Sequence, residues 1–333
     1  MAERLLAGLI VVPFLLGAAA VPTDRAQVVF SFQDNDIVES SGLVVVDGLV
    51  VTTNDSGDTG RVFTVDPATG RTVGVTDWSD DPEDVEALAP LDDDTVWVGD
   101  LGDNTESRDT IQVAPVPVGR GNDGIDGPVY DLVYPDGPHN AETLMSDPTT
   151  GRLYVATKET LGGTLYAAPA RLDRTRPNVL EPLGEVLPIA TDGAFLADGK
   201  HLVIRNYAVA AVYAFPSLER VDDFQLPAQP QGEGLAVDTD GTLLLSSEGL
   251  HAKVLRVALP TGTAPPSASP SDGSTSSSPS PSPSSSPTTH TESREDSELP
   301  ETTQTQRPAW PWFLGGLVGL GCLVVLLRSL RRR

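Results

Sequence analysis

The stretch Glu86-Ala87-Leu88, at the centre of the apolar run 85–90, decides the fold because four similar steps occur elsewhere in the chain. Each step opens a short apolar run, and the copies return every 40 to 56 residues. The five steps are Ser41-Gly42-Leu43, Glu86-Ala87-Leu88, Glu142-Thr143-Leu144, Gly193-Ala194-Phe195 and Glu233-Gly234-Leu235. Strand-length runs that recur with such a period predict a β-propeller or a solenoid rather than a simple sandwich.

Four-stranded blades account for the spacing. The first repeat contains four runs separated by turn signals, at 42–46, 49–53, 61–65 and 72–76. The fifth repeat supplies only three, and residues 28–32, which precede the first repeat, are expected to complete it by pairing beside 253–258. Such pairing of the two ends removes exposed sheet edges. We therefore expect an all-β, five-bladed propeller over residues 27–260; six blades are the alternative count.

Residues 1–26 have the pattern of a secretory signal peptide. A short charged start precedes the apolar stretch 5–16, and small residues follow at Ala18 and Ala20. We expect cleavage near Ala20, with a second candidate site after Ala26. An uncleaved N-terminal anchor is the alternative. In both cases the protein is expected to be exported.

Residues 309–327 are predicted to form a transmembrane helix, because the apolar run from Trp310 just spans the hydrocarbon core at about 1.5 Å per residue. Trp310 and Trp312 suit the headgroup interface. Four arginines lie in the tail 328–333, so the positive-inside rule places this tail in the cytoplasm. We therefore expect a single-pass protein of the cell membrane with its propeller outside.

Residues 261–308 are expected to form a disordered stalk, since Ser, Thr and Pro dominate most of this segment. Leu299-Pro300-Glu301-Thr302-Thr303, near its end, resembles a cell-wall sorting signal in which Thr303 replaces the usual glycine. Covalent attachment to the cell wall by a sortase is therefore the alternative to membrane anchoring.

The exported part is strongly acidic and contains no disulfide. Residues 21–327 carry 46 acidic and 17 basic side chains, a formal net charge of −29. This charge argues against nucleic acid as a partner and is compatible with cation binding; solubility outside the cell is the simpler explanation. The only cysteine, Cys322, lies in the predicted span, so the propeller must depend on a sizeable apolar core.

The first strand of each propeller blade lines the central channel, so one repeat position forms a ring around the axis. Here the ring contains Ser41, Glu86, Glu142, Gly193 and Glu233. Three carboxylates in a narrow channel repel one another unless a cation lies between them or some are protonated. We therefore expect Ca²⁺ bound by Glu86, Glu142 and Glu233, with Ser41 contributing. The alternative is that these acids cap the channel through water and backbone contacts.

The ends of the second strands should meet the same channel mouth. They carry Asp55 and Asp100, and also two bases, Lys158 and Arg205, in otherwise acidic surroundings. A metal ion with a Lys and an Arg suits the hydrolysis of a phosphate, and we predict these four residues as catalytic. Alternatively, both bases neutralise their acidic neighbours.

The repeats resemble two propeller families. The order Ser-Gly-Leu, Glu-x-Leu, Glu-x-Leu, a small-residue step and Glu-Gly-Leu is similar to that of calcium-activated nucleotidases (apyrases). That resemblance implies five blades and an axial calcium ion. Asn54-Asp55-Ser56-Gly57, Gly99-Asp100-Leu101-Gly102, Asn140-Ala141-Glu142 and Gln231-Gly232-Glu233-Gly234 look closer to uncharacterised secreted bacterial propellers of the phytase-like, esterase-like type. That resemblance suggests hydrolysis.

Two functions remain open at this point. The first is a surface-anchored, Ca²⁺-binding hydrolase of phosphorylated or esterified small molecules. The second is a non-catalytic propeller that binds a small molecule, glycan or protein at the cell surface, since propellers support both roles. No Gly-x-Ser-x-Gly, His-Glu-x-x-His or Walker motif occurs. The direction in which Lys158 and Arg205 point should separate the two hypotheses.

Overall fold

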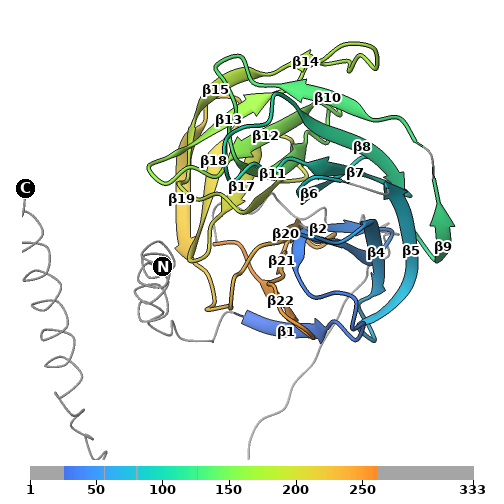
Figure 1. Cartoon of the computed structure of the whole chain (residues 1–333). Helices are drawn as coiled ribbons and strands as arrows, with labels where there is room; N and C mark the ends of the chain where they lie inside the picture. The colour runs from blue at the N-terminus through green and yellow to red at the C-terminus, as the bar shows by residue number, and fades with distance from the viewer. Residues whose placement is uncertain (1–25, 56, 80–81, 126, 261–333) are drawn as a thin grey trace, which may run out of the picture. The chain divides into compact units, whose positions relative to one another are not determined.

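Five sheets follow one another around a central axis in the computed structural model, which describes residues 26–55, 57–79, 82–125 and 127–260. The first strands of successive sheets contact one another in a closed cycle, so the sheets are the five blades of a β-propeller (Figure 1). The described residues contain no helix that is long and apolar enough to cross a membrane. The predicted signal peptide up to residue 25, the stalk, the span and the basic tail lie outside them.

The first three blades begin at the axis and run outward. Blade 1 contains β2 (Ser40–Val46), β3 (Leu49–Asn54), β4 (Gly60–Asp66) and β5 (Arg71–Ser79). Blade 2 contains β6 (Val85–Pro90), β7 (Thr95–Asp100), β8 (Ile111–Pro117) and β10 (Tyr130–Val133). Blade 3 contains β11 (Ala141–Ser146), β12 (Leu153–Thr157), β13 (Gly163–Ala167) and β15 (Glu181–Val186). The predicted strands lie within a few residues of these bounds.

The last two blades complete the ring. Blade 4 contains β16 (Asp192–Phe195), β17 (His201–Arg205), β18 (Val209–Ala214) and β19 (Glu219–Gln225). Blade 5 contains β20 (Leu235–Val237), β21 (Leu243–Leu245), β22 (Lys253–Val257) and, as its outer strand, β1 (Ala26–Ser31). β1 pairs antiparallel with β22, from Ala26 opposite Val257 to Ser31 opposite Lys253 (Figure 1). The predicted five-blade count and the predicted closure by the N-terminal strand are both confirmed.

Two short edge strands were not expected from the sequence. β9 (Gly121–Gly124) adds to β5, and β14 (Asn178–Val179) adds to β10, both in parallel. Gly, Asn and Asp are depleted in strands, so these segments carry no strand pattern. Gly74 on β5 makes the first addition possible, because a Cβ there would lie only 1.9 Å from the carbonyl oxygen of Gly119.

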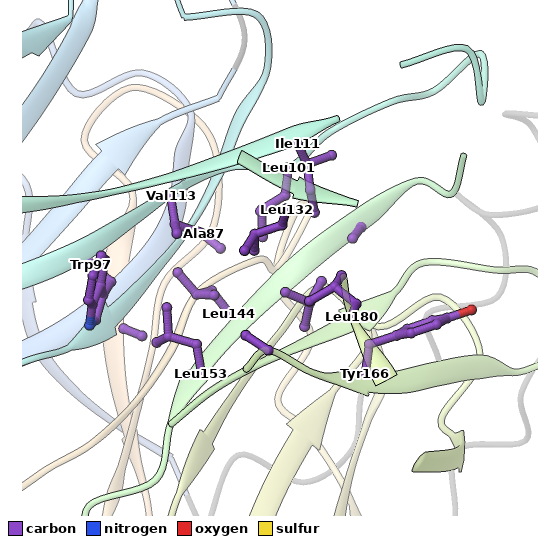
Figure 2. Close-up of a cluster of buried hydrophobic side chains, with 14 of the residues drawn as sticks. Ala87, Trp97, Leu101, Ile111, Val113, Leu132, Leu144, Leu153, Tyr166 and Leu180 are labelled. Atoms are coloured by element: carbon purple, nitrogen blue, oxygen red, sulfur yellow. The ribbon is translucent and has the colours of Figure 1, made fainter. Parts of the chain in front are cut away.

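The core lies between neighbouring blades. Figure 2 shows one of five such clusters, in which Trp97 and Leu132 of blade 2 pack with Leu144 and Tyr166 of blade 3. Leu132 and Leu144 have no exposed surface. Among the described residues, the ladders and clusters that close the ring lie within the segment 26–260, which therefore has a hydrophobic core of its own, as an independently folding domain does.

The repeated small residue has a packing role at the axis. A Cβ on Gly42 would lie 2.5 Å from the backbone nitrogen of Leu88 in the next blade. A Cβ on Gly234 would lie 2.8 Å from Cβ of Leu43 and 3.0 Å from the carbonyl oxygen of Ser41. Glycine therefore lets neighbouring inner strands approach closely, which accounts for the small residue in the repeated step.

Candidate metal centre

Three of the predicted ring residues sit at β-bulges. Strand pairing skips from Ser40 to Leu43 in blade 1, from Val85 to Ala87 in blade 2, and from Ala141 to Thr143 in blade 3. A bulge leaves one residue outside the regular ladder and redirects its side chain. The residues set apart in this way include Ser41, Glu86 and Glu142, the predicted ring residues of these blades.

Blade 4 is built differently. β16 pairs with β17 from Asp192 to Phe195 without a bulge, and Gly193 offers no side chain to the ring. The carboxylate of this blade, Asp192, is fully buried and accepts hydrogen bonds from the backbone nitrogens of Gly193 (2.8 Å) and Leu235 (2.6 Å). The carboxylate of Asp192 therefore links blade 4 to blade 5 by a hydrogen bond and does not serve as a ring ligand.

The closest group of carboxylates at the channel mouth is an acidic trio, Asp55, Asp84 and Glu86. One oxygen of each lies within 4.8 Å of the others. Asp55 follows β3, Asp84 precedes β6 and Glu86 belongs to β6, so the trio joins blades 1 and 2. The hydroxyl of Ser41 adds a contact, lying 3.0 Å from Glu86 Oε2 and 2.8 Å from the Glu86 carbonyl oxygen.

The remaining ring carboxylates belong to a lysine cluster formed by Lys158, Glu142, Tyr207 and Glu233. The ammonium of Lys158 pairs with Glu142 Oε1 and lies 5.3 Å from the centre of the Tyr207 ring. Tyr207 in turn opposes the rise that burial causes in the pKa of Glu233. Burial alone would lower the pKa of Lys158, but the carboxylates of Glu142 and Glu233 outweigh it and hold that pKa above its usual value. A protein cation therefore already occupies this half of the mouth.

Burial and the proximity of like charges raise the pKa values of several acids at the mouth. Burial, then the charges of Glu142, Asp55 and Asp84, raise the pKa of Glu86 to about 10. Burial raises the pKa of Glu142 to about 8, against the opposing effect of Lys158. Burial and the neighbouring Asp55 raise the pKa of Asp84 to about 6. A bound cation would relieve this crowding of negative charge.

Three buried carboxylate oxygens have no hydrogen-bond partner among the described residues. They are Asp84 Oδ1, Glu142 Oε2 and Glu233 Oε2. Buried polar atoms in folded proteins nearly always have a partner, so these oxygens call for water or an ion. Oxygen ligands from carboxylates are those that Ca²⁺ prefers. Of these three oxygens, Asp84 Oδ1 belongs to the trio, and the carboxylates of the trio are the kind of donor that a hard divalent cation takes.

Asp100, a predicted catalytic residue, positions the trio. Its carboxylate accepts hydrogen bonds from the backbone nitrogens of Glu83 (3.0 Å) and Asp84 (2.9 Å) and from Nη1 of Arg108 (2.7 Å). Asn54 makes the equivalent contacts in blade 1, where it accepts from the backbone nitrogens of Val38 and Glu39. Asp100 therefore fixes the segment that carries Asp84, two residues before Glu86.

Arg205, another predicted catalytic residue, has no exposed surface. Its Nη1 donates to the carbonyl oxygens of Gly234 (3.0 Å) and Ser246 (3.4 Å), both in blade 5. Burial lowers its pKa to about 10, while Glu233 opposes this shift. A Cβ on Gly232 would lie 2.3 Å from Arg205 Nη2, so the glycine of Gln231-Gly232-Glu233 makes room for the guanidinium. The positive charge of Arg205 thus stabilises the carboxylate of Glu233, and its Nη1 group donates hydrogen bonds to backbone carbonyl oxygens of blade 5.

The structure brings the predicted site residues together in part. Asp55 and Glu86 share the acidic trio, Ser41 contacts it, and Glu142, Glu233 and Lys158 form the adjoining lysine cluster. Asp84 was missed. The repeat contains a signal for it, because a polar residue stands two positions before the ring residue in all five repeats: Glu39, Asp84, Asn140, Thr191 and Gln231.

Comparisons with solved structures found distant similarity of fold. No family model matches the chain, and no curated protein matches it. A glutaminyl cyclase of Myxococcus xanthus is similar with 12% identity and a TM-score of 0.46, over 70% of this chain and 97% of the other. A gluconolactonase of Xanthomonas campestris shows 13% identity and a TM-score of 0.44, over 72% and 92%. A nidogen/laminin complex shows 17% identity and a TM-score of 0.40, over 63% and 73%.

Proposed function

We propose that the acidic trio holds a divalent cation, Ca²⁺ in an exported protein, and that this mouth hydrolyses a phosphate or related ester of a small molecule. The approach of Asp55, Asp84 and Glu86 to within 4.8 Å of one another carries the proposal. The trio replaces the larger ligand set expected from the ring position, because Lys158 already neutralises Glu142. Ser41 supports the site through its contact with Glu86.

The charge balance at the mouth supports a cation. Eight carboxylates influence one another there, and three bases, Lys158, Arg205 and Arg108, act on them. The eight acids are Glu39, Asp55, Asp84, Glu86, Asp100, Glu142, Glu233 and Glu248. Lys158 and Arg205 act on Glu233, and Arg108 acts on Asp84 and pairs with Asp100, so the described residues of the mouth keep an excess of negative charge.

The chain's own residues would divide the work of hydrolysis as follows. Ca²⁺ would supply Lewis-acid polarisation of a substrate oxygen, and three carboxylates leave part of its coordination shell to water or substrate. Lys158, whose side chain is 18% exposed, would hold negative charge on the substrate. Tyr207 would orient Lys158 through its ring. Asp100 would keep Asp84 in place. Arg205 would hold Glu233 from the buried side.

A non-catalytic binding role is the second candidate, and two observations favour it. Lys158 is already paired with Glu142, so an anionic substrate would have to compete for its charge. Two leucines on loops that follow second strands are exposed, Leu161 completely and Leu250 by 56%. These exposed leucines would be available for contact with a partner.

A substrate screen separates the two functions. The purified propeller, residues 26–260, is tested on nucleotides, phytate and simple esters, in Ca²⁺ and in chelator. Hydrolysis in Ca²⁺ only, lost in Asp84→Asn and kept in Asp93→Asn, is the expected result. Asp93 lies on the exposed β6–β7 turn and is the matched control. Calcium binding without turnover of any substrate would favour the non-catalytic role.

A further inference from the structure

A second concavity lies at the opposite end of the central channel. It has a volume of about 880 Å³ and is lined by residues from all five inner strands. The lining residues Val45, Met145, Ala194 and Val237 follow the ring positions along their strands, so this axial cavity faces away from the acidic trio. Nothing in the proposed metal chemistry uses it.

The inner part of the axial cavity is apolar and is formed by small side chains. Ala194, Val45 and Val237 remain partly exposed although their strands lie at the centre of the fold, because they face the cavity. Pockets that bind small molecules usually have volumes of about 300–1,000 Å³ and mostly apolar walls. Burial of apolar surface against an apolar ligand is favourable. The cavity therefore has the size and the lining of a small-molecule site.

The rim of the axial cavity determines the charge of its ligand. Three aspartates stand there, Asp198, Asp238 and Asp240, and no Lys, Arg or His is among the residues that line the described cavity. Asp238 pairs with Arg256 at 2.7 Å and Asp198 with His201 at 2.8 Å. Asp240 accepts from the backbone nitrogen and the hydroxyl of Thr242 and lies within the electrostatic influence of Arg256. The rim still carries more acidic than basic side chains, so a negatively charged ligand would be repelled there in a chain of net charge −25.

We propose that the axial cavity is a binding site for a small apolar molecule that is neutral or cationic. The site is separate from the metal centre and does not depend on it. Apolar contacts with the inner strands would provide the affinity, and the aspartate rim would exclude anions.

Two fluorescent compounds that differ by one charge test both parts of the proposal. N-phenylnaphthylamine is neutral, and anilinonaphthalenesulfonate carries a sulfonate on the same aromatic skeleton. The neutral compound should bind the propeller, residues 26–260, saturably and with one site, and the sulfonate should bind at least about tenfold more weakly at low salt. Absence of saturable binding of the neutral compound overturns the site. Equal affinities overturn the charge selectivity.

Matched variants locate the binding. Ala194→Trp fills the cavity and should weaken binding of the neutral compound by at least about tenfold. Leu183→Trp adds the same indole to β15, at a position 37% exposed and outside the cavity, and should bind as the wild type does. Ala197→Trp, at the exposed rim, is the second variant should Ala194→Trp fail to fold by circular dichroism. Unchanged binding in a folded Ala194→Trp or in Ala197→Trp contradicts the proposal.

The charge of the rim is tested separately. Asp240→Asn keeps the oxygen that accepts from Thr242 and removes the charge. The affinity for the sulfonate should rise by about threefold, while that for the neutral compound stays the same. No change in the ratio of the two affinities means that Asp240 does not select against anions.

Discussion

Lys158 pairs with Glu142 inside the ring of inner strands, so this half of the channel mouth already contains a positive charge. We therefore expect a bound cation in the other half, at Asp55, Asp84 and Glu86. Lys158 offsets part of the negative charge of Glu142 and Glu233 in blades 3 and 5. In the acidic trio, between blades 1 and 2, Arg108 acts to lower the pKa of Asp84 and Lys158 that of Glu86, but burial and the neighbouring carboxylates outweigh both effects.

Replacement of Lys158 should separate catalysis from metal binding. Lys158→Met removes a partly exposed base of the mouth, so turnover of a phosphate or ester substrate should fall by about a hundredfold. The rise in melting temperature caused by Ca²⁺ should persist, because Asp55, Asp84 and Glu86 are unchanged. Steady-state kinetics and thermal melting of the same preparation provide the two measurements. Undiminished turnover would remove Lys158 from the catalytic machinery.

The close packing of Gly232 against Arg205 predicts a coupled pair. Gly232→Ala should destabilise the propeller by about 1–3 kcal/mol, because its Cβ would meet the guanidinium at 2.3 Å. In an Arg205→Met background the same change should cost clearly less. Gly124→Ala, where a Cβ meets nothing within 4 Å, is the matched control. Denaturant unfolding of the wild type, the two single variants Gly232→Ala and Arg205→Met, and the double variant gives the coupling energy between the two positions. A coupling energy of zero would contradict the contact.

Closure of the ring by β1 predicts a contrast between two of its residues. Phe30 is 7% exposed and packs between blades 5 and 1, whereas Val28 is 49% exposed. Phe30→Ala should cost about 3–5 kcal/mol of unfolding free energy and Val28→Ala much less. Deletion of residues 26–33 should lower stability further. Equal effects of the two substitutions in chemical denaturation would argue against the closure.

The acids of the mouth predict how stability depends on pH in chelator. Burial raises the pKa of Glu142 to about 8 and that of Glu248 to about 7, above the usual value near 4.3. The folded state therefore binds more protons than the unfolded state between about pH 4 and 8, and stability should fall as pH rises through this window. Between about pH 4 and 8, Lys158 is charged in both the folded and the unfolded state, so it does not contribute to the pH dependence of stability. Unfolding free energies measured from pH 5 to 8 check the sign, and a rise with pH would be the contrary result.

The sequence predicted which strands surround the site better than it predicted the contacts that the site residues make. The repeated step located the inner strands, and the missing strand of the fifth repeat predicted the pairing of β1 with β22. The bulges at Glu86 and Glu142 depend on how neighbouring strands pair, which a single repeat does not reveal. The same limit applies to Arg205. Its place at the end of β17 led to the prediction that Arg205 lines the channel mouth. Its side chain instead enters the space that Gly232 leaves in blade 5.

The acidic trio shows the other limit. Asp84 belongs to a loop, and hydrogen bonds from its segment to Asp100 and from Gly102 to its carbonyl oxygen hold it beside Glu86. Its polar counterparts in other repeats mark the position, but Glu39, Asn140 and Gln231 differ in charge, so no repeated chemistry indicates a ligand there. Sequence reasoning therefore found the channel mouth and two of the three carboxylates of its closest group.

Thermal melting of the propeller in millimolar Ca²⁺ and in chelator tests the central claim most directly. A ligand at about a hundred times its Kd stabilises the folded state by about 2.7 kcal/mol, so the melting temperature should rise by roughly 5–10 °C. Asp84→Asn should abolish this rise and Asp93→Asn should keep it. The same melting temperature in Ca²⁺ and in chelator, or an equal rise in Asp84→Asn, would contradict a calcium site at Asp55, Asp84 and Glu86.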